Sequence, residues 1–148
     1  MGSRAMMMRQ DRFLDGKTVL FAYEHKLTHD LLISTLKQSG AGTTYSGTPA
    51  DMLARLKDFK PDIIICEYAM EPVNGGAFVR FIRQKMAITV PVVMLINTGD
   101  REAQAQARLL DIEQTLTIPF ATNDVLTALK KVSGGGKPVV RRELNFGG

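Results

Sequence analysis

The chain has a single cysteine, Cys66, and no apolar run long enough to cross a membrane. A lone cysteine cannot form an intrachain disulfide, which is typical of proteins in a reducing cytoplasm. A membrane helix needs about 18 or more consecutive apolar residues, and the first residues also lack the apolar segment of a secretory signal. We therefore expect a cytoplasmic protein without a membrane span.

Basic residues exceed acidic ones by four, and much of this excess lies near the two ends of the 148-residue chain. The basic residues are not interleaved with aromatic ones and do not follow one helix, so nucleic-acid binding is not expected. The length fits one domain. We expect a flexible amino-terminal segment at 1–16, which can include residues left by cloning, a folded domain at 17–133, and a basic, glycine-rich tail at 134–148.

Short apolar runs alternate with amphipathic stretches along the folded part. This alternation is typical of βαβ units, in which helices cover both faces of a parallel sheet. We expect five strands, at 18–23, 42–46, 62–66, 89–96 and 114–118. The expected helices are 27–38, a second from Pro49 to near Phe59, a third opening at Gly75, 100–110 and 121–132.

Glu67 follows a buried strand directly, in the stretch PDIIICEYAMEPVNGG at 61–76. A buried charge without a partner costs several kcal/mol, so an acid at this position needs an explanation. Open α/β sheets carry their chemistry at the carboxyl ends of their strands. Glu67 is therefore either a working group or the remnant of one.

Three segments together resemble the receiver domain of bacterial two-component response regulators. They are PDIIICEYAMEPVNG, PVVMLIN in the fourth expected strand, and LTIPF in the fifth. The resemblance covers about 17–133, with Pro72 one place later than the family's proline. It implies a single α/β domain with a five-stranded, parallel, doubly wound sheet, which is flavodoxin-like and of the receiver type.

The resemblance also implies that the reactive positions of the family are changed. The aspartate that accepts the phosphoryl group corresponds to Glu67, and the two Mg²⁺-binding acids correspond to Tyr23 and Glu24. The hydroxyl residue and the lysine that stabilise the phosphoryl group correspond to Ile96 and Ile118. Phosphoryl transfer depends on positioning and charge stabilisation, so we predict a degenerate receiver, or pseudo-receiver, with no catalytic residue and no enzyme activity.

The predicted function is that of a stand-alone signalling module that binds another protein without phosphorylation. The resemblance implies a histidine kinase, a phosphotransferase or another regulator as partner, or a second copy of the chain. The expected contact face is the fourth helix, fifth strand and fifth helix, where Thr115 replaces the family's aromatic switch residue. Its candidate residues are Arg108, Thr115, Phe120 and Lys130.

Several alternatives remain open from the sequence. Arg141 and Arg142 in the tail could bind the phosphates of a nucleotide second messenger. Glu67 could itself accept a phosphoryl group, imitate a phosphorylated aspartate, or persist only because it faces solvent. With Glu24 it could bind a metal, but two carboxylates are too few for a tight site, so no cofactor is expected. Lys26 could form an ion pair with Glu67.

Overall fold

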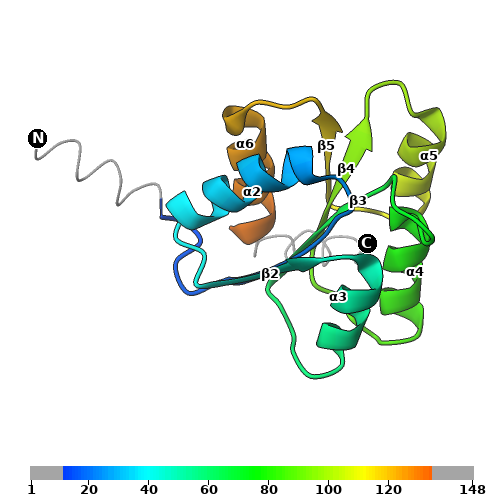
Figure 1. Ribbon diagram of the computed structural model, residues 1–148, viewed down its shortest axis with the longest axis horizontal. Coiled ribbons are helices and arrows are strands. Elements are labelled where there is room, and N and C mark those ends of the chain that lie inside the picture. Colours follow the sequence, from blue (N-terminus) through cyan, green and yellow to red (C-terminus); the bar gives the residue numbers. More distant parts are fainter. Residues whose placement is uncertain (1–11, 135–148) are drawn as a thin grey trace, which may run out of the picture.

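The computed structural model describes residues 12–134, and within them five strands alternate with five helices (Figure 1). In chain order these are β1 (Thr18–Ala22), α2 (Lys26–Gln38), β2 (Thr43–Gly47), α3 (Pro49–Leu56), β3 (Ile63–Glu67), α4 (Gly75–Gln84), β4 (Val92–Asn97), α5 (Arg101–Leu109), β5 (Gln114–Ile118) and α6 (Thr122–Ser133). The predicted alternation of strands and helices is confirmed. The tail with Arg141 and Arg142 lies outside the described residues.

The five strands form one parallel sheet in the order β2-β1-β3-β4-β5. Helices α2 and α6 cover one face, and α3, α4 and α5 cover the other (Figure 1). The predicted five-stranded, doubly wound fold is therefore correct. Within residues 12–134, no helix is long and apolar enough to cross a membrane.

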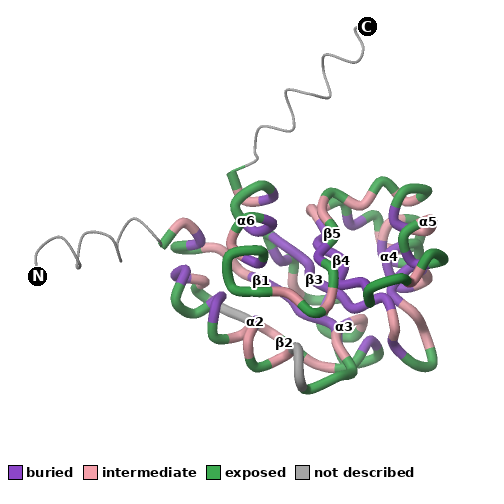
Figure 2. Tube along the Cα trace, turned by 90° about the horizontal axis from the view of Figure 1, so that it is seen from above, coloured by how far each residue is buried: buried purple, intermediate pink, exposed green. Residues whose placement is uncertain are grey.

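The central strand β3 is buried along its whole length (Figure 2). Because side chains alternate between the faces of a strand, Ile63 and Ile65 pack with α2 and α6, whereas Ile64 and Cys66 pack with α3, α4 and α5. The same alternation directs Glu67 toward the α2 and α6 face. This strand places an acid at the carboxyl edge of the sheet, between two apolar layers.

Helices α3 and α4 begin with side-chain caps. Thr48 accepts a hydrogen bond from the backbone N–H of Asp51, and Pro49 is the first helical residue of α3, as the sequence predicts. Asn74 caps α4 in the same way. A side chain at Gly75 would collide with the backbone carbonyl oxygen of Glu67, so only glycine lets α4 begin this close to β3.

The element bounds differ from the expected ones where proline or local packing intervenes. Strand β4 begins at Val92 rather than at residue 89, since Pro91 has no N–H to donate to a ladder. Strand β3 extends through Glu67. Two residues before the expected boundary at residue 17 also pack on the domain, since Leu14 is fully buried and Asp15 forms a bridge with Ala41. Residues 1–11 lie outside the described part.

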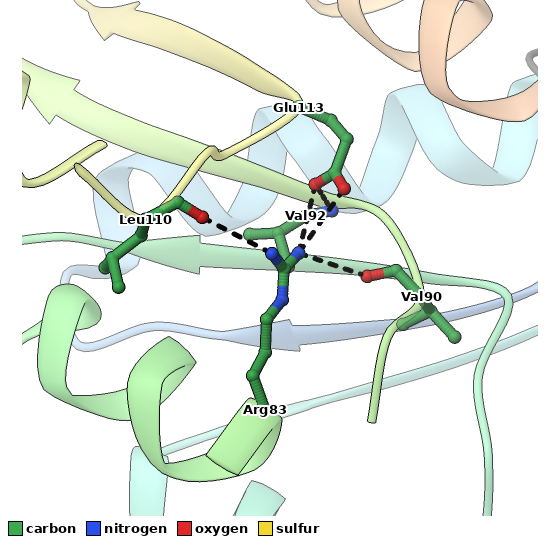
Figure 3. A network of polar contacts seen from close by, with 5 residues as sticks. All are labelled: Arg83, Val90, Val92, Leu110 and Glu113. Carbon is green, nitrogen blue, oxygen red and sulfur yellow. Dashed lines mark hydrogen bonds and ion pairs between the residues drawn. The ribbon is translucent and has the colours of Figure 1, made fainter. Parts of the chain in front are cut away.

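Arg83 on α4 connects three segments at the amino-terminal edge of the sheet (Figure 3). Its guanidinium donates to the carbonyl oxygens of Leu110 at 3.4 Å and Val90 at 3.5 Å, and to the Glu113 carboxylate at 3.1 Å. Glu113 also accepts the backbone N–H of Val92 at 2.9 Å. The network ties α4 to the start of β4 and to the connection between α5 and β5.

Candidate functional site

The carboxylate of Glu67 is buried and engaged by the loop between β1 and α2. Only 1% of the residue is exposed. Its Oε1 atom accepts hydrogen bonds from the backbone N–H groups of Glu24 at 2.8 Å and His25 at 3.1 Å. The Nδ1 atom of His25 lies 3.1 Å from the same oxygen. The interpretation of Glu67 as a solvent-facing remnant is therefore wrong.

The local sequence explains why α2 needs this carboxylate. The N-cap position of α2 is His25, whose side chain makes no capping hydrogen bond, and the first turn contains no acidic residue. A helix start has free N–H groups and a partial positive charge, which a carboxylate stabilises by about 1 kcal/mol. From β3, Glu67 accepts the N–H groups of the N-cap residue His25 and of Glu24 before it, and so places its carboxylate beside the helix start. His25 makes the side-chain contact that we expected from Lys26, which is exposed.

Glu24, the other acid of the site, holds the loop that follows β3. Its side chain is exposed, and its Oε1 atom accepts the backbone N–H of Glu71 at 2.9 Å. Both candidate metal-binding carboxylates thus bind backbone donors. No group of three or more His, Cys, Asp or Glu residues within the described part of the chain is arranged to hold a metal ion.

Ile96 and Ile118 offer nothing to an anion near Glu67. Ile96 is 2% exposed and packs in the core beneath α3, α4 and α5. Ile118 is half-buried and packs on the opposite face, with α2 and α6. The hydroxyl of Thr98, which sequence reasoning overlooked, donates to the carbonyl oxygen of Ile118 at 2.8 Å. This hydrogen bond joins the chain just after β4 to the last residue of β5.

The side chain of Tyr23 packs against other aromatic rings and does not act as a metal ligand. Its ring lies 4.4 Å from the imidazole of His29 and 5.1 Å from the ring of Phe21. The side chain is half-buried in the layer between the sheet and α2. Tyr23 is therefore a packing residue of the β1–α2 side.

Tyr68 connects the end of β3 to α5. Its ring is buried with the α3, α4 and α5 layer, and its backbone N–H donates to the carbonyl of Leu95. Burial raises the pKa of the Tyr68 hydroxyl, and the carboxylates of Glu102 and Asp100 raise the pKa further. Glu102 lies in the first turn of α5 and Asp100 is the N-cap residue of that helix. The residue after Glu67 is thus sensitive to the charges at the start of α5, a helix of the expected partner face.

The four predicted partner residues fall into two groups. Arg108 and Thr115 are exposed and line one groove of about 520 Å³ between α5 and β5, together with Asp111. Lys130 lies on α6, on the other face of the sheet, and its ammonium group is 5.5 Å from the ring centroid of Phe13. Phe120 is half-buried and packs on that same face.

Comparison with known families agrees with this architecture. The family described as "Response regulator receiver domain" matches residues 19–130. The chain belongs to this family. Receiver domains act in two-component signalling, where they interact with histidine kinases and other regulators.

Two curated relatives are 32% and 27% identical to this receiver domain over the aligned residues. Regulator of RpoS from Escherichia coli strain K12 is 32% identical over 106 residues, which cover 72% of this chain and 31% of that protein. Protein PilG from Pseudomonas aeruginosa is 27% identical over 117 residues, covering 78% of this chain and 87% of PilG. The chain thus spans about a third of the first relative's length and most of the second's.

Solved structures confirm the fold at lower identity. The chemotaxis response regulator CheY4 of Vibrio cholerae superposes with a TM-score of 0.70 at 22% identity, covering 78% of this chain and 98% of that one. The receiver domain of a histidine kinase from Syntrophus aciditrophicus gives a TM-score of 0.72 at 19% identity. The match covers 81% of this chain and 92% of that one.

Proposed function

We propose that this receiver domain signals without phosphorylation at Glu67, by binding a partner protein through α5, β5 and α6. One observation carries the proposal. The Glu67 carboxylate is buried and accepts the backbone N–H groups of Glu24 and His25, so the position of the reactive group serves to hold the β1–α2 loop.

The geometry opposes phosphoryl transfer for three separate reasons. Oε1 of Glu67 is occupied by donors, and the glutamate is one methylene longer than the aspartate that receivers use. Ile96 and Ile118 supply neither the hydroxyl nor the cation that stabilises the transferred group. Because such catalysis depends on positioning and charge stabilisation, each loss raises the barrier.

The same contacts argue against a permanent imitation of the phosphorylated state. The negative charge of Glu67 is directed to the β1–α2 loop, whereas a switch in this family would have to act through β4 and β5. Thr115 is exposed and has no ring to rotate inward. A charge shifts an equilibrium only if it contacts the two states differently, and these contacts provide no such difference at β5.

The exposure of β5, the last strand, supports the proposal that the partner binds at this face. Strand β5 lies at the edge of the sheet, with Thr115 and Thr117 exposed. Arg108 and Asp111 carry opposite charges along the adjoining groove. A mixed-charge, partly apolar groove beside an edge strand fits a protein partner, such as a histidine kinase, a phosphotransferase or another regulator.

Treatment with acetyl phosphate and Mg²⁺, followed by intact mass measurement, tests the central part of the proposal. We expect no phosphoryl adduct on the chain, and none on the Glu67→Asp variant, since Ile96 and Ile118 remain. A receiver domain with an intact aspartate site serves as positive control. A stable adduct mapped to Glu67 in the unaltered chain would overturn the proposal.

A further inference from the structure

Three side chains form a hydrogen-bonded series between α2 and β2, apart from the Glu67 contacts. The Nε2 atom of His29 lies 3.2 Å from the hydroxyl oxygen of Ser46. The Nδ1 atom of the same imidazole lies 3.3 Å from a carboxylate oxygen of Asp30. Serine, histidine and aspartate thus occupy the order in which nucleophile, base and orienting acid are found in acyl-transfer sites.

The chemistry of the groups assigns the proton positions. A carboxylate can only accept a hydrogen bond, so Nδ1 of His29 carries the proton that faces Asp30. In the neutral imidazole, Nε2 is then the acceptor. It faces the Ser46 hydroxyl, which donates to it. This is the tautomer that a general base needs in order to remove the serine proton.

Packing fixes the imidazole while leaving the serine open to solvent. The His29 ring lies 4.4 Å from the Tyr23 ring and is stacked on Phe21 at 6.0 Å with an interplanar angle of 13°. Only 17% of the His29 side chain is exposed, whereas Ser46 is exposed on β2. The base is therefore held in place, and a small electrophile can reach the hydroxyl.

We propose that Ser46 is a nucleophile, activated by His29, that accepts an acyl group from an activated ester. The Ser46 Oγ forms a bond to the carbonyl carbon and the ester C–O bond breaks. The serine proton passes to Nε2 of His29 and from there to the leaving alkoxide, so atoms and charge balance. Asp30 is a positioning residue, because it acts through His29. The reaction is a single transfer that leaves an acylated serine.

Acyl transfer fits this site better than phosphoryl transfer. A phosphoryl group carries negative charge and needs cations to stabilise it. Within residues 12–134, no lysine or arginine forms an ion pair with Asp30, and the carboxylate itself would repel the group. A neutral ester carries no such penalty. The inference is independent of the function proposed for Glu67 and the α5–β5–α6 face.

A fluorophosphonate probe tests the proposal, since the serine oxygen displaces fluoride from phosphorus while His29 takes the proton. We expect one adduct, mapped to Ser46 by peptide mass analysis. Ser46→Ala should abolish labelling, and His29→Gln should slow it about a hundredfold, the scale of general-base catalysis. Asp30→Asn should slow it less, and Asp30→Glu should retain most of the rate.

Ser34→Ala is the matched control, because Ser34 is an exposed serine on α2. It should leave labelling unchanged. Far-ultraviolet circular dichroism and the melting temperature confirm that each variant is folded. Absence of an adduct on Ser46 in the unaltered chain would overturn the proposal. Labelling of Ser46 at an equal rate in the folded His29→Gln variant would do the same, because it would show exposure without activation.

Discussion

The Oε1 atom of Glu67 accepts a hydrogen bond at 2.8 Å from the backbone N–H of Glu24, a residue 43 positions earlier in the chain. The bond joins the carboxyl end of the central strand to the start of α2. Glu67, the residue that we predict to occupy the phosphoacceptor position, thus holds the β1–α2 loop. The first predictions follow from this relationship.

Replacement of Glu67 should lower the stability of the domain in a graded way. Glu67→Ala leaves the N–H groups of Glu24 and His25 without their acceptor, at a cost of about 2 kcal/mol in the free energy of unfolding. Glu67→Gln keeps an acceptor oxygen and should cost about half as much. Urea denaturation, followed by circular dichroism, measures both. An alanine variant as stable as the unaltered chain would show that these bonds contribute nothing.

Partner binding should depend on the groove beside β5 and not on the pocket around Glu24 and Glu67. Arg108→Glu reverses a charge in the groove and should weaken binding by about 1 kcal/mol or more. Glu24→Gln, a matched exposed change in the pocket, should alter it by less than about 0.5 kcal/mol. Affinity capture with the two variants, followed by titration of the recovered partner, compares them. The opposite ranking would place the signal in the pocket.

The Arg83–Glu113 network should contribute to stability as a unit. Arg83→Met and Glu113→Ala each remove hydrogen bonds that join α4, β4 and the connection to β5. A double-mutant cycle on the free energy of unfolding should give a coupling of roughly 1 kcal/mol. The pair is partly exposed, so the coupling should shrink at high salt. Additive effects of the two substitutions would contradict this expectation.

Stability should fall in alkaline solution, and Tyr68 should cause part of the fall. The folded chain raises the pKa of this hydroxyl, so the native state holds the proton more tightly than the unfolded state. The stabilisation is complete below the ordinary tyrosine value of about 10 and is lost as the pH rises from there toward the folded value. Melting temperatures from pH 9 to 11 should therefore fall less steeply for Tyr68→Phe.

Cys66 contributes to the same alkaline loss and provides the control. Burial raises the pKa of its thiol from 9.0 to about 12, so its contribution disappears across that interval. Cys66→Ala should flatten the curve from about pH 9 upward, earlier than Tyr68→Phe does. If neither variant changes the slope, the burial of these two groups has no effect on proton binding in the folded state.

Local patterns in the sequence are sufficient for most of the fold. Strand β5 begins and ends where its apolar and β-branched residues predict, and the Thr48-Pro49 pair marks the start of α3. The apolar run at 89–96 predicts a strand that includes Pro91. Because Pro91 has no N–H for the strand pairing, β4 begins after it, at Val92. Such strand boundaries depend on individual backbone N–H groups, which the pattern of apolar residues does not predict.

The partners of Glu67 could not be predicted in the same way. Two of its contacts are backbone N–H groups, which every residue except proline carries, so side-chain identities give no indication of them. One signal was present. Helix α2 begins at Lys26 without a capping side chain or an early acid, and a helix start of this kind requires an acceptor from elsewhere in the fold.

Because the thiol of Cys66 is fully buried, its chemical modification can measure local opening of the fold. A thiol-reactive reagent cannot reach this group on the central strand unless the layer of α3, α4 and α5 moves away from the sheet. Since the sequence contains no other cysteine, every modified molecule records one such event. The rate of thiol modification under native conditions thus measures how often the central strand becomes accessible, without any engineered label.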